Sequence, residues 1–391
     1  MGSVRNDVLR KLLGLRQLHC LRELMVPMPI EAGLRMRIVA LFAAVLPIAT
    51  SAYAYHCRTI QLKPPPRIFN TPAWNASGDH IFLVDVVAGE IESYSLSGER
   101  ERSVIRPGTD QLDFSRPNSI VSTPSGFVLK DGGSRFILLN RALTPIQAFG
   151  IGGDPPVAWD AAPFKWAPTE GGLVAYGDVR VANAPWKTGL FRVSWGDPPK
   201  LDFLRQMPGR EAKEPYLLEG NYVVRVGQSF YFLSFEPEYG VFEINGRLLR
   251  LMKGLPAGFG VLPSLPESHG RSSMAILYAA LSRTKSIAGL LVAGDHLYVL
   301  LRDVTAGRRK WLLAEYDLLQ ERTVAILNLP TSADHVEMAA GSKWLAIVEK
   351  GPFLADERFA PGNVILVPTT ALQTLHAAGG SVATPKDLCG H

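Results

Sequence analysis

The chain has 391 residues, of which 47% are hydrophobic and 20% are charged. That balance belongs to a globular protein and excludes a disordered or low-complexity chain. The formal net charge of +5 comes mostly from the N-terminal 54 residues, which hold seven basic and three acidic side chains. The remaining 34 basic and 33 acidic residues nearly cancel, so we expect no broad electrostatic surface for nucleic acid.

The N-terminal residues 1–54 read as a leader. Two arginines, Arg35 and Arg37, precede the apolar run at 38–48, and the small-x-small triplet Ala-Tyr-Ala at 52–54 follows it. This order predicts a signal peptide, and therefore an exported protein that is periplasmic or secreted.

The predicted signal peptide occupies residues 36–54, and Met36 is our hypothesis for the true start of translation, which would make residues 1–35 a gene-start artefact. The alternative is an uncleaved N-terminal anchor, which would be the chain's one contact with a membrane.

Only Cys57 and Cys389 remain beyond the leader, at the two ends of the exported chain. An oxidising compartment favours pairing of an even number of cysteines. The pair would either form a disulfide that ties the termini together or remain two separate thiols. The disulfide is our working prediction.

Beyond residue 66, apolar alternating runs broken by Gly, Pro, Asp and Asn recur to about residue 370. They group into units of four short strands, whose first strands read TPAWNAS, NSIVSTP, FKWAPTE, NYVVRVG, AGLLVAG and HVEMAAG. One such sheet cannot bury both of its faces alone, whereas a ring of sheets can. We therefore predict an all-β fold, a six-bladed β-propeller of four-stranded antiparallel blades, as a single domain over residues 55–391 closed by its termini.

The segment 256–288 interrupts the repeat between units four and five. Its second half carries an apolar stripe at helical spacing, formed by Met274, Leu277, Tyr278 and Leu281. The stripe predicts a short helical insertion over 272–284, lying over one face or edge of the ring; a loop is the alternative.

The second unit resembles an NHL repeat, a building block of many six-bladed propellers. The matching residues are Pro117, Ile120, Gly126, Val128, Asp131, Arg135, Ile137 and the pair Phe149-Gly150. The first unit matches in part, with Pro72, Gly78, Phe82 and Asp85, and the later units keep only the strand rhythm. The resemblance implies an exported bacterial propeller that serves as a binding scaffold more often than as an enzyme.

A second resemblance is to gluconolactonase-like propellers, which hold a divalent cation in the central channel. Pro117-Asn118-Ser119 is similar to one element of their pattern. In this alternative the chain is a metal-dependent lactonase or hydrolase, and Asn118, Asn221 and Glu337 supply oxygen ligands to calcium or zinc. The simpler interpretation makes Asn118 a turn former. Since no nucleophile, zinc-binding or phosphate-binding motif accompanies these residues, we expect a non-catalytic protein without a cofactor.

Aromatic and polar residues near the starts of the units are the candidate ligand-binding groups. We predict that the protein is a monomer that binds a peptide, protein or glycan at one face of the ring. The residues concerned are Trp74, Arg116, Asn118, Trp159, Lys165, Trp166, Asn221 and His335. Each tryptophan has core packing as its alternative role. His335 and Glu337 alternate on one strand, so they should face the same side, and we expect them to form a solvated pair.

Overall fold

The computed structural model describes residues 57–66, 73–105, 112–150, 159–206, 223–259, 283–351, 362–372 and 386–389, apart from short gaps within these ranges. Residues Tyr55–His391 form one compact unit. The signal peptide predicted at 36–54 lies outside the described residues. So does the predicted helix, except for its last two positions, which lie in a turn. Among the described residues, no helix is long and apolar enough to cross a membrane.

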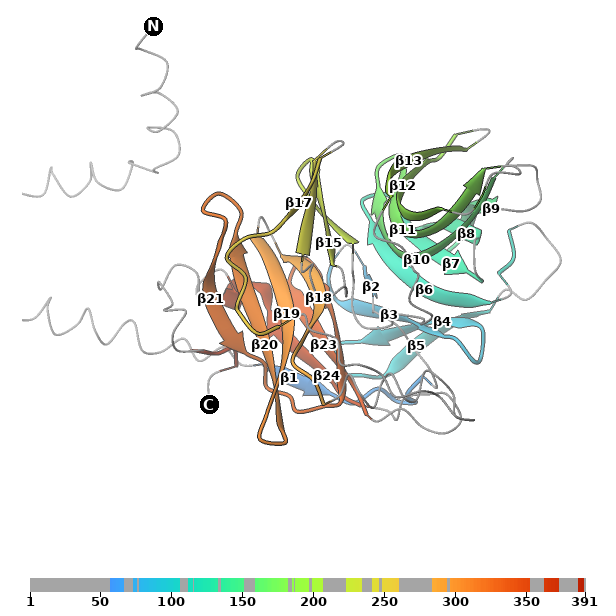
Figure 1. Cartoon of the computed structure of the whole chain (residues 1–391). Helices are drawn as coiled ribbons and strands as arrows, with labels where there is room; N and C mark the ends of the chain where they lie inside the picture. The colour runs from blue at the N-terminus through green and yellow to red at the C-terminus, as the bar shows by residue number, and fades with distance from the viewer. Residues whose placement is uncertain are drawn as a thin grey trace, which may run out of the picture. The chain divides into compact units, whose positions relative to one another are not determined.

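Antiparallel sheets make up nearly all of the described regular structure, with one short helical turn at 369–372 (Figure 1). Each of the first four sheets contains four strands that follow one another along the chain. The first sheet contains β2 (Ala73–Trp74), β3 (His80–Asp85), β4 (Glu90–Ser95) and β5 (Arg100–Ile105). The second contains β6 (Pro117–Thr123), β7 (Gly126–Asp131), β8 (Arg135–Asn140) and β9 (Pro145–Gly150).

The third and fourth sheets repeat this arrangement. The third contains β10 (Trp159–Thr169), β11 (Gly172–Val181), β12 (Lys187–Ser194) and β13 (Lys200–Gln206). The fourth contains β14 (Val223–Val226), β15 (Ser229–Leu233), β16 (Val241–Asn245) and β17 (Leu248–Leu251).

The fifth sheet departs from the predicted four strands. It contains β18 (Ser286–Ala293), β19 (His296–Thr305), β20 (Arg308–Asp317) and β21 (Arg322–Asn328), and β25 (Lys386–Asp387) joins its outer edge in parallel. Because β18 begins at Ser286, the predicted insertion at 256–288 ran three residues into an inner strand and was wrong at that boundary.

The remaining sheet, which we call the closing sheet, takes strands from both ends of the chain. Its order is β1 (Arg58–Ile60), β24 (Val364–Pro368), β23 (Trp344–Lys350) and β22 (His335–Ala340). The sequence pattern placed all four strands of this unit near the C-terminus, but the outermost strand comes from the N-terminal segment. Because β1 pairs with β24, this sheet joins the N-terminal segment to the C-terminal segment and closes the ring of sheets.

The first strand of each sheet lies innermost. These strands contact one another in the cyclic order β2, β6, β10, β14, β18, β22 and back to β2. Sheets stacked around an axis in this way form a β-propeller, in which the inner strands run in one direction. The central channel therefore has two distinct ends, one where the inner strands begin and one where they finish.

Apolar side chains fill the spaces between adjacent sheets. In the space between the second and third sheets, Phe136 meets Trp166 edge-on with ring centroids 5.1 Å apart, and Phe149 stacks on Trp195 at 4.7 Å. Large rings suit this position because they bury area on both sheets at once.

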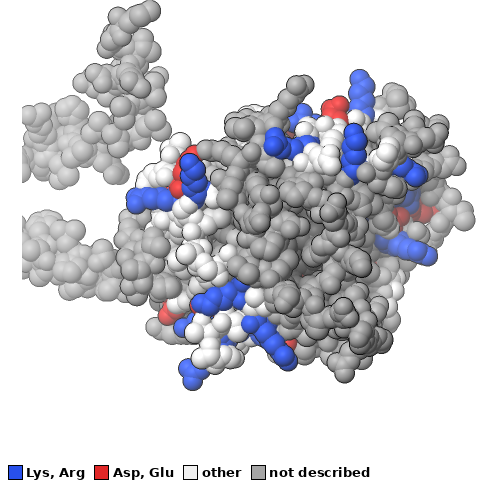
Figure 2. All heavy atoms as spheres, viewed as in Figure 1, with Lys and Arg blue, Asp and Glu red and all other residues white. Residues whose placement is uncertain are grey.

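Charged side chains are dispersed over the surface. On the face drawn in Figure 2, the Lys and Arg side chains of the described residues lie in several separate places with white or red neighbours. They form no continuous basic stripe among the residues that the structure describes on this face.

A disulfide joins Cys57 to Cys389 across 332 residues of sequence, which confirms the predicted pairing. Cys57 precedes β1 of the closing sheet, and Cys389 follows β25 of the fifth sheet. The bond therefore fastens the outer edges of two neighbouring sheets.

Replacing both cysteines, as Cys57→Ser/Cys389→Ser, should lower the free energy of unfolding by about 2–4 kcal/mol, because the unfolded chain regains the freedom that the cross-link removes. Urea unfolding with and without dithiothreitol measures the change. The reductant should destabilise the natural chain and leave the double variant unaffected; equal stability of the two oxidised proteins would show that the bond contributes nothing.

Candidate binding site in the central channel

Buried charged side chains concentrate at the end of the channel where the inner strands begin, which we call the charged end. Among the described side chains of the two innermost strands of each sheet, every buried Asp, Glu, Lys, Arg or His lies there: Asp85, Asp131, Arg302, His335, Glu337 and Lys350. Burying a charge is costly unless it is paired, so such a concentration is a feature typical of functional sites.

Glu337 of β22 and Lys350 of β23 form a buried ion pair at the charged end. The Glu337 carboxylate lies 2.5 Å from the Lys350 ammonium, and the two side chains are only 6% and 3% exposed. Cross-strand register brings the residues together, because His335 pairs with Lys350 and Glu337 follows two positions later on the same face. The expectation of a solvated His335–Glu337 pair was wrong, since both residues are buried.

Arg302 of β19 is fully buried in the neighbouring sheet. Its guanidinium donates to the Ser286 hydroxyl at 2.8 Å and lies over the Trp311 ring, 5.5 Å from the centroid. Arginine tolerates such a place because its planar cation can stack on an aromatic face while its N–H groups donate in the plane. Neither Arg302 nor Lys350 was predicted from the sequence, where each looks like an ordinary strand-end charge.

Two aspartates at the charged end support turns. Asp85 accepts hydrogen bonds from the backbone N–H groups of Val87 and Ala88 after β3. Asp131 accepts from the backbone of Arg116 and pairs with Arg135 at 2.8 Å. These contacts fix the backbone where β6 begins and β7 finishes.

Asn118 lies in a bulge of β6 at the charged end. Its amide donates to the Gly132 carbonyl at 3.0 Å, and its carbonyl oxygen accepts from the Ser119 hydroxyl. Nearby on β7, burial lowers the pKa of Lys130 to about 8, because the ammonium loses water. We call these fixed polar side chains at the charged end the polar frame, and it includes both Asn118 and Lys130.

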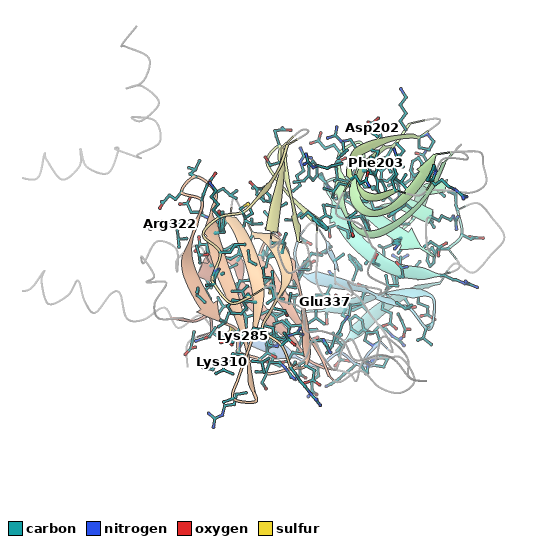
Figure 3. The ribbon with its side chains drawn as sticks, viewed as in Figure 1. Asp202, Phe203, Lys285, Lys310, Arg322 and Glu337 are labelled. Carbon is teal, nitrogen blue, oxygen red and sulfur yellow. A yellow bond between two sulfur atoms is a disulfide. The ribbon has the colours of Figure 1, made fainter. Side chains whose placement is uncertain are left out.

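Ion pairs between more exposed side chains continue this frame around the fifth sheet. Lys285 lies 2.9 Å from the Asp303 carboxylate, and Arg309 pairs with Asp334. Figure 3 shows Lys285 and Lys310 near the lower end of the fifth sheet, and Arg322, which begins β21, near the upper end of that sheet; Glu337 of β22 lies nearer the centre of the molecule.

The opposite end of the channel contains a partly open hollow. A cavity of about 170 Å³ lies among β2, β6, β14, β18 and β22. Its lining residues are Ala73, Trp74, Val121, Ser122, Val224, Leu291, Val292, Met338, Ala339 and Ala340.

Trp74 spans three sheets at the cavity wall and is 3% exposed. Its indole N–H donates to the Ala339 carbonyl at 3.1 Å, while its backbone exchanges hydrogen bonds with the Ser122 hydroxyl. A side chain at Gly341 would collide with the indole, at 2.7 Å from its Cγ. Trp74 is therefore a core residue, which is the alternative role that the sequence analysis gave for each tryptophan.

The other predicted binding residues have different places. Arg116 is exposed beside the charged end, and Trp166 is partly buried between sheets. The backbones of Trp159 and Lys165 belong to β10, but their side chains lie outside the description, as does the whole of Asn221.

Of the three predicted metal ligands, Asn118 and Glu337 lie within the described residues and Asn221 does not. The Glu337 carboxylate forms an ion pair with Lys350, and the Asn118 side-chain amide donates a hydrogen bond to the Gly132 carbonyl. Among the described residues, no three His, Cys, Asp or Glu side chains gather in a way that could hold a metal ion.

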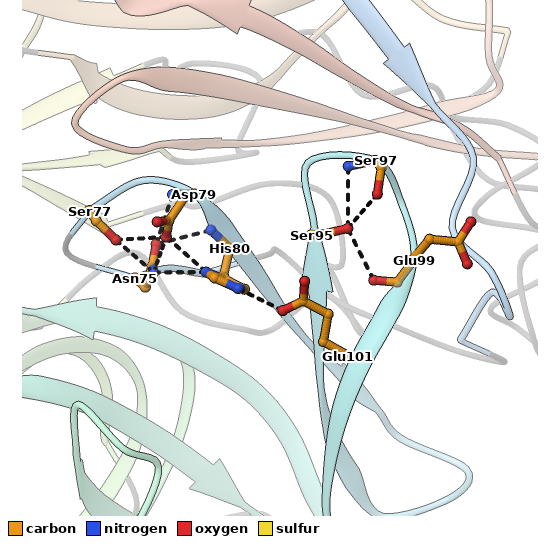
Figure 4. Close-up of polar contacts among 8 residues, drawn as sticks. All are labelled: Asn75, Ser77, Asp79, His80, Ser95, Ser97, Glu99 and Glu101. Carbon is orange, nitrogen blue, oxygen red and sulfur yellow. Dashed lines mark hydrogen bonds and ion pairs between the residues drawn. The ribbon is translucent and has the colours of Figure 1, made fainter.

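A separate polar cluster lies on the β2–β3 turn, away from the charged end (Figure 4). Asn75 accepts from the backbones of Asp79 and His80, and Ser77 donates to Asp79. His80 lies between two carboxylates, 2.8 Å from that of Asp79 and 2.7 Å from that of Glu101 on β5. The hydrogen bond to Asp79, assisted by Glu101, raises the pKa of His80 above 6.5.

Comparisons with known proteins give only distant likenesses. No family model and no curated protein matches the chain. A solved structure of a protein named as exported, from Bacteroides fragilis, is 11% identical over 81% of this chain and 96% of its own, with a TM-score of 0.48. A gluconolactonase from Xanthomonas campestris is 12% identical over 78% and 86%, with a TM-score of 0.43. The calcium-binding protein regucalcin from Agrobacterium tumefaciens is 12% identical over 84% and 96%, with a TM-score of 0.42. Such likenesses carry no argument about activity.

Replacing Lys350 by methionine should destabilise the fold by about 3–5 kcal/mol, because the Glu337 carboxylate would stay buried without its ammonium. The double variant Glu337→Leu/Lys350→Met should recover most of that loss, since it removes both charges. Denaturant unfolding of the two variants measures this; additive losses in the double variant would contradict the pairing.

His80 should stabilise the fold most at mildly acidic pH. Its folded pKa is raised, so its contribution is complete below about pH 6.5 and is lost as the pH rises through the folded value. The melting-temperature difference between the natural chain and His80→Gln should therefore shrink as the pH rises from about 6.5 through the raised folded pKa. A difference that stays constant over this range would show that the imidazolium is not the stabilising form.

Proposed function

We propose that the chain is an exported six-bladed β-propeller that binds a peptide, protein or glycan over the charged end of its ring, without catalysing a reaction. The cyclic contacts of the six inner strands support the blade count. Two findings support export: the leader pattern at 36–54, and the Cys57–Cys389 disulfide, a bond that persists in oxidising compartments.

The observation that carries the binding proposal is the concentration of buried charges at one end of the channel. These groups hold one another and the nearby turns in fixed geometry, as the Glu337–Lys350 pair and the Asp131 contacts do. A rigid polar frame of this kind lowers the cost of ordering side chains when a partner binds.

Exposed side chains beside the frame would make the direct contacts. Arg116 is exposed and its backbone is fixed by Asp131, which makes it a suitable contact for a carboxylate, a peptide carbonyl or a sugar hydroxyl. Lys285 is 43% exposed and lies on a neighbouring part of the same end. Loops carried on rigid strands are a common location for recognition.

Peptide and glycan arrays probed with the purified chain from residue 55 test this function. Arg116→Ala should weaken binding to the retained ligands about fivefold, or about 1 kcal/mol. The matched control is Arg141→Ala, because Arg141 is also exposed but lies on the β8–β9 turn at the other end of the second sheet. Its binding should equal that of the natural chain.

Three results would contradict the proposal: no retained ligand on either array, equal losses in the two variants, or turnover. For the last, metal analysis and a lactone-hydrolysis assay of the same preparation decide between the binding protein and the metal-dependent hydrolase.

A further inference from the structure

The hairpin formed by β19 and β20 extends past the rest of the fifth sheet at the charged end (Figure 1). On one side, β18 pairs with β19 only as far as Arg302; on the other side, β21 pairs with β20 only from Leu312 onward. The strand residues beyond these points pair across the hairpin, as Asp303 does with Lys310. We call residues 303–310 the arm.

The arm is held in a fixed geometry. Its strands are joined by the two-residue turn Ala306-Gly307, with φ values of 51° and 72°, which is the conformation of a tight hairpin turn. On one face of the arm, the Asp303 carboxylate lies 2.9 Å from the Lys285 ammonium. On the other face, Arg309 forms an ion pair with Asp334, which precedes the closing sheet. Contacts on both faces therefore fix the arm against two neighbouring segments.

These ion pairs leave two cations of the arm available to a partner. Arg308 and Lys310 are exposed, and neither forms an ion pair with an acidic side chain in the part of the chain that the structure describes. Asp303 lies directly across the hairpin from Lys310, but its carboxylate contacts Lys285 (Figure 3). Because Arg308 and Lys310 are two positions apart on one strand, they point to the same side.

We propose that the arm binds an acidic, extended segment of a partner polypeptide. This inference rests on the proposed function, binding at the charged end, and adds the chemical class of the partner. Alternate residues of a strand are about 7 Å apart, so an extended peptide with acidic side chains at every second position repeats its carboxylates at the spacing of Arg308 and Lys310. The arginine can bind a carboxylate through two N–H groups, and the lysine adds a compact positive charge.

An anionic membrane is the competing partner and fits the arm less well. Protein segments that lie on membranes combine cations with apolar side chains that enter the lipid boundary. Among the described residues, the exposed large apolar side chains are those of Val87, Ile146 and Leu319, and none of them belongs to the arm. The arm thus offers charge without an apolar anchor.

Fluorescence anisotropy of two labelled peptides tests the proposal on the oxidised chain from residue 55. One peptide alternates Glu and Ser, and the other has Gln in place of Glu. We expect saturable binding of the acidic peptide alone, weakened by added salt. Arg308→Glu/Lys310→Glu should weaken it about tenfold, because two attractions become repulsions. The matched control is Arg141→Glu/Lys200→Glu, which changes the net charge equally at exposed positions of the other end and should bind normally.

The proposal is wrong if the acidic peptide does not bind saturably, if the Gln peptide binds equally well, or if the two double variants lose binding equally. Capture of the chain by phosphatidylglycerol vesicles or heparin, without binding of the acidic peptide, would also overturn it. Circular dichroism checks the fold, and Arg308→Gln/Lys310→Gln replaces an arm variant that does not fold.

The Arg116→Ala variant separates this inference from the proposed function. Weaker peptide binding in Arg116→Ala, with none lost in the arm variant, would refute the arm and leave the proposed function in place. Weaker binding in the arm variant, with none lost in Arg116→Ala, would refute the contact proposed for Arg116 and leave the arm in place.

Discussion

The N-terminal segment holds the ring of sheets together. Residues 58–60 pair with β24 of the closing sheet. Three residues later, the Lys63 N–H donates to the carbonyl of Gly98 in the β4–β5 turn, and the Lys63 carbonyl accepts from the N–H of Arg100, the first residue of β5. One short stretch thus links the last sheet to the first. The Cys57–Cys389 disulfide extends the link to the fifth sheet, where β25 pairs with β21.

This closure places strict demands on a few residues. Gly98 has a φ of +89°, and a Cβ there would lie 2.1 Å from the Gln61 carbonyl oxygen, so only glycine lets the N-terminal segment approach the turn. At the ring centre, Trp74 joins the first sheet to the second and to the closing sheet. Adjacent sheets elsewhere are held mainly by apolar side chains, whose attraction has little directional preference. The polar contacts of Trp74 and of the termini are what fix the geometry of the seam.

Much of the architecture could be predicted from the sequence because period-two patterns and turn residues are local signals. Six stretches with these signals each overlap the inner strand of a different sheet. The origin of β1 was not predictable in this way: three residues at 58–60 carry no repeat pattern, and their partner lies about 300 positions away. The parallel strand β25 was missed for the same reason.

The candidate site was less predictable than the fold. Tryptophan content suggested exposed contacts, but Trp74 is buried because the inner strands of a propeller converge. Arg302 and Lys350 look like solvated strand ends in the sequence, and only cross-strand register reveals that they face Ser286 and the strand that carries Glu337. The one hint was that Arg302 interrupts a long apolar run, LYVLL, with a charge.

Hydrogen exchange of the Cys389→Ser chain starting at residue 64, compared with the Cys57→Ser/Cys389→Ser chain starting at residue 55, tests the closure most directly. Both lack the disulfide, so the difference isolates the N-terminal segment. We predict that the amides of residues 364–367 and of the β4–β5 turn lose protection together, although they are far apart in the sequence. Unchanged protection in both places would show that the ring does not depend on this segment.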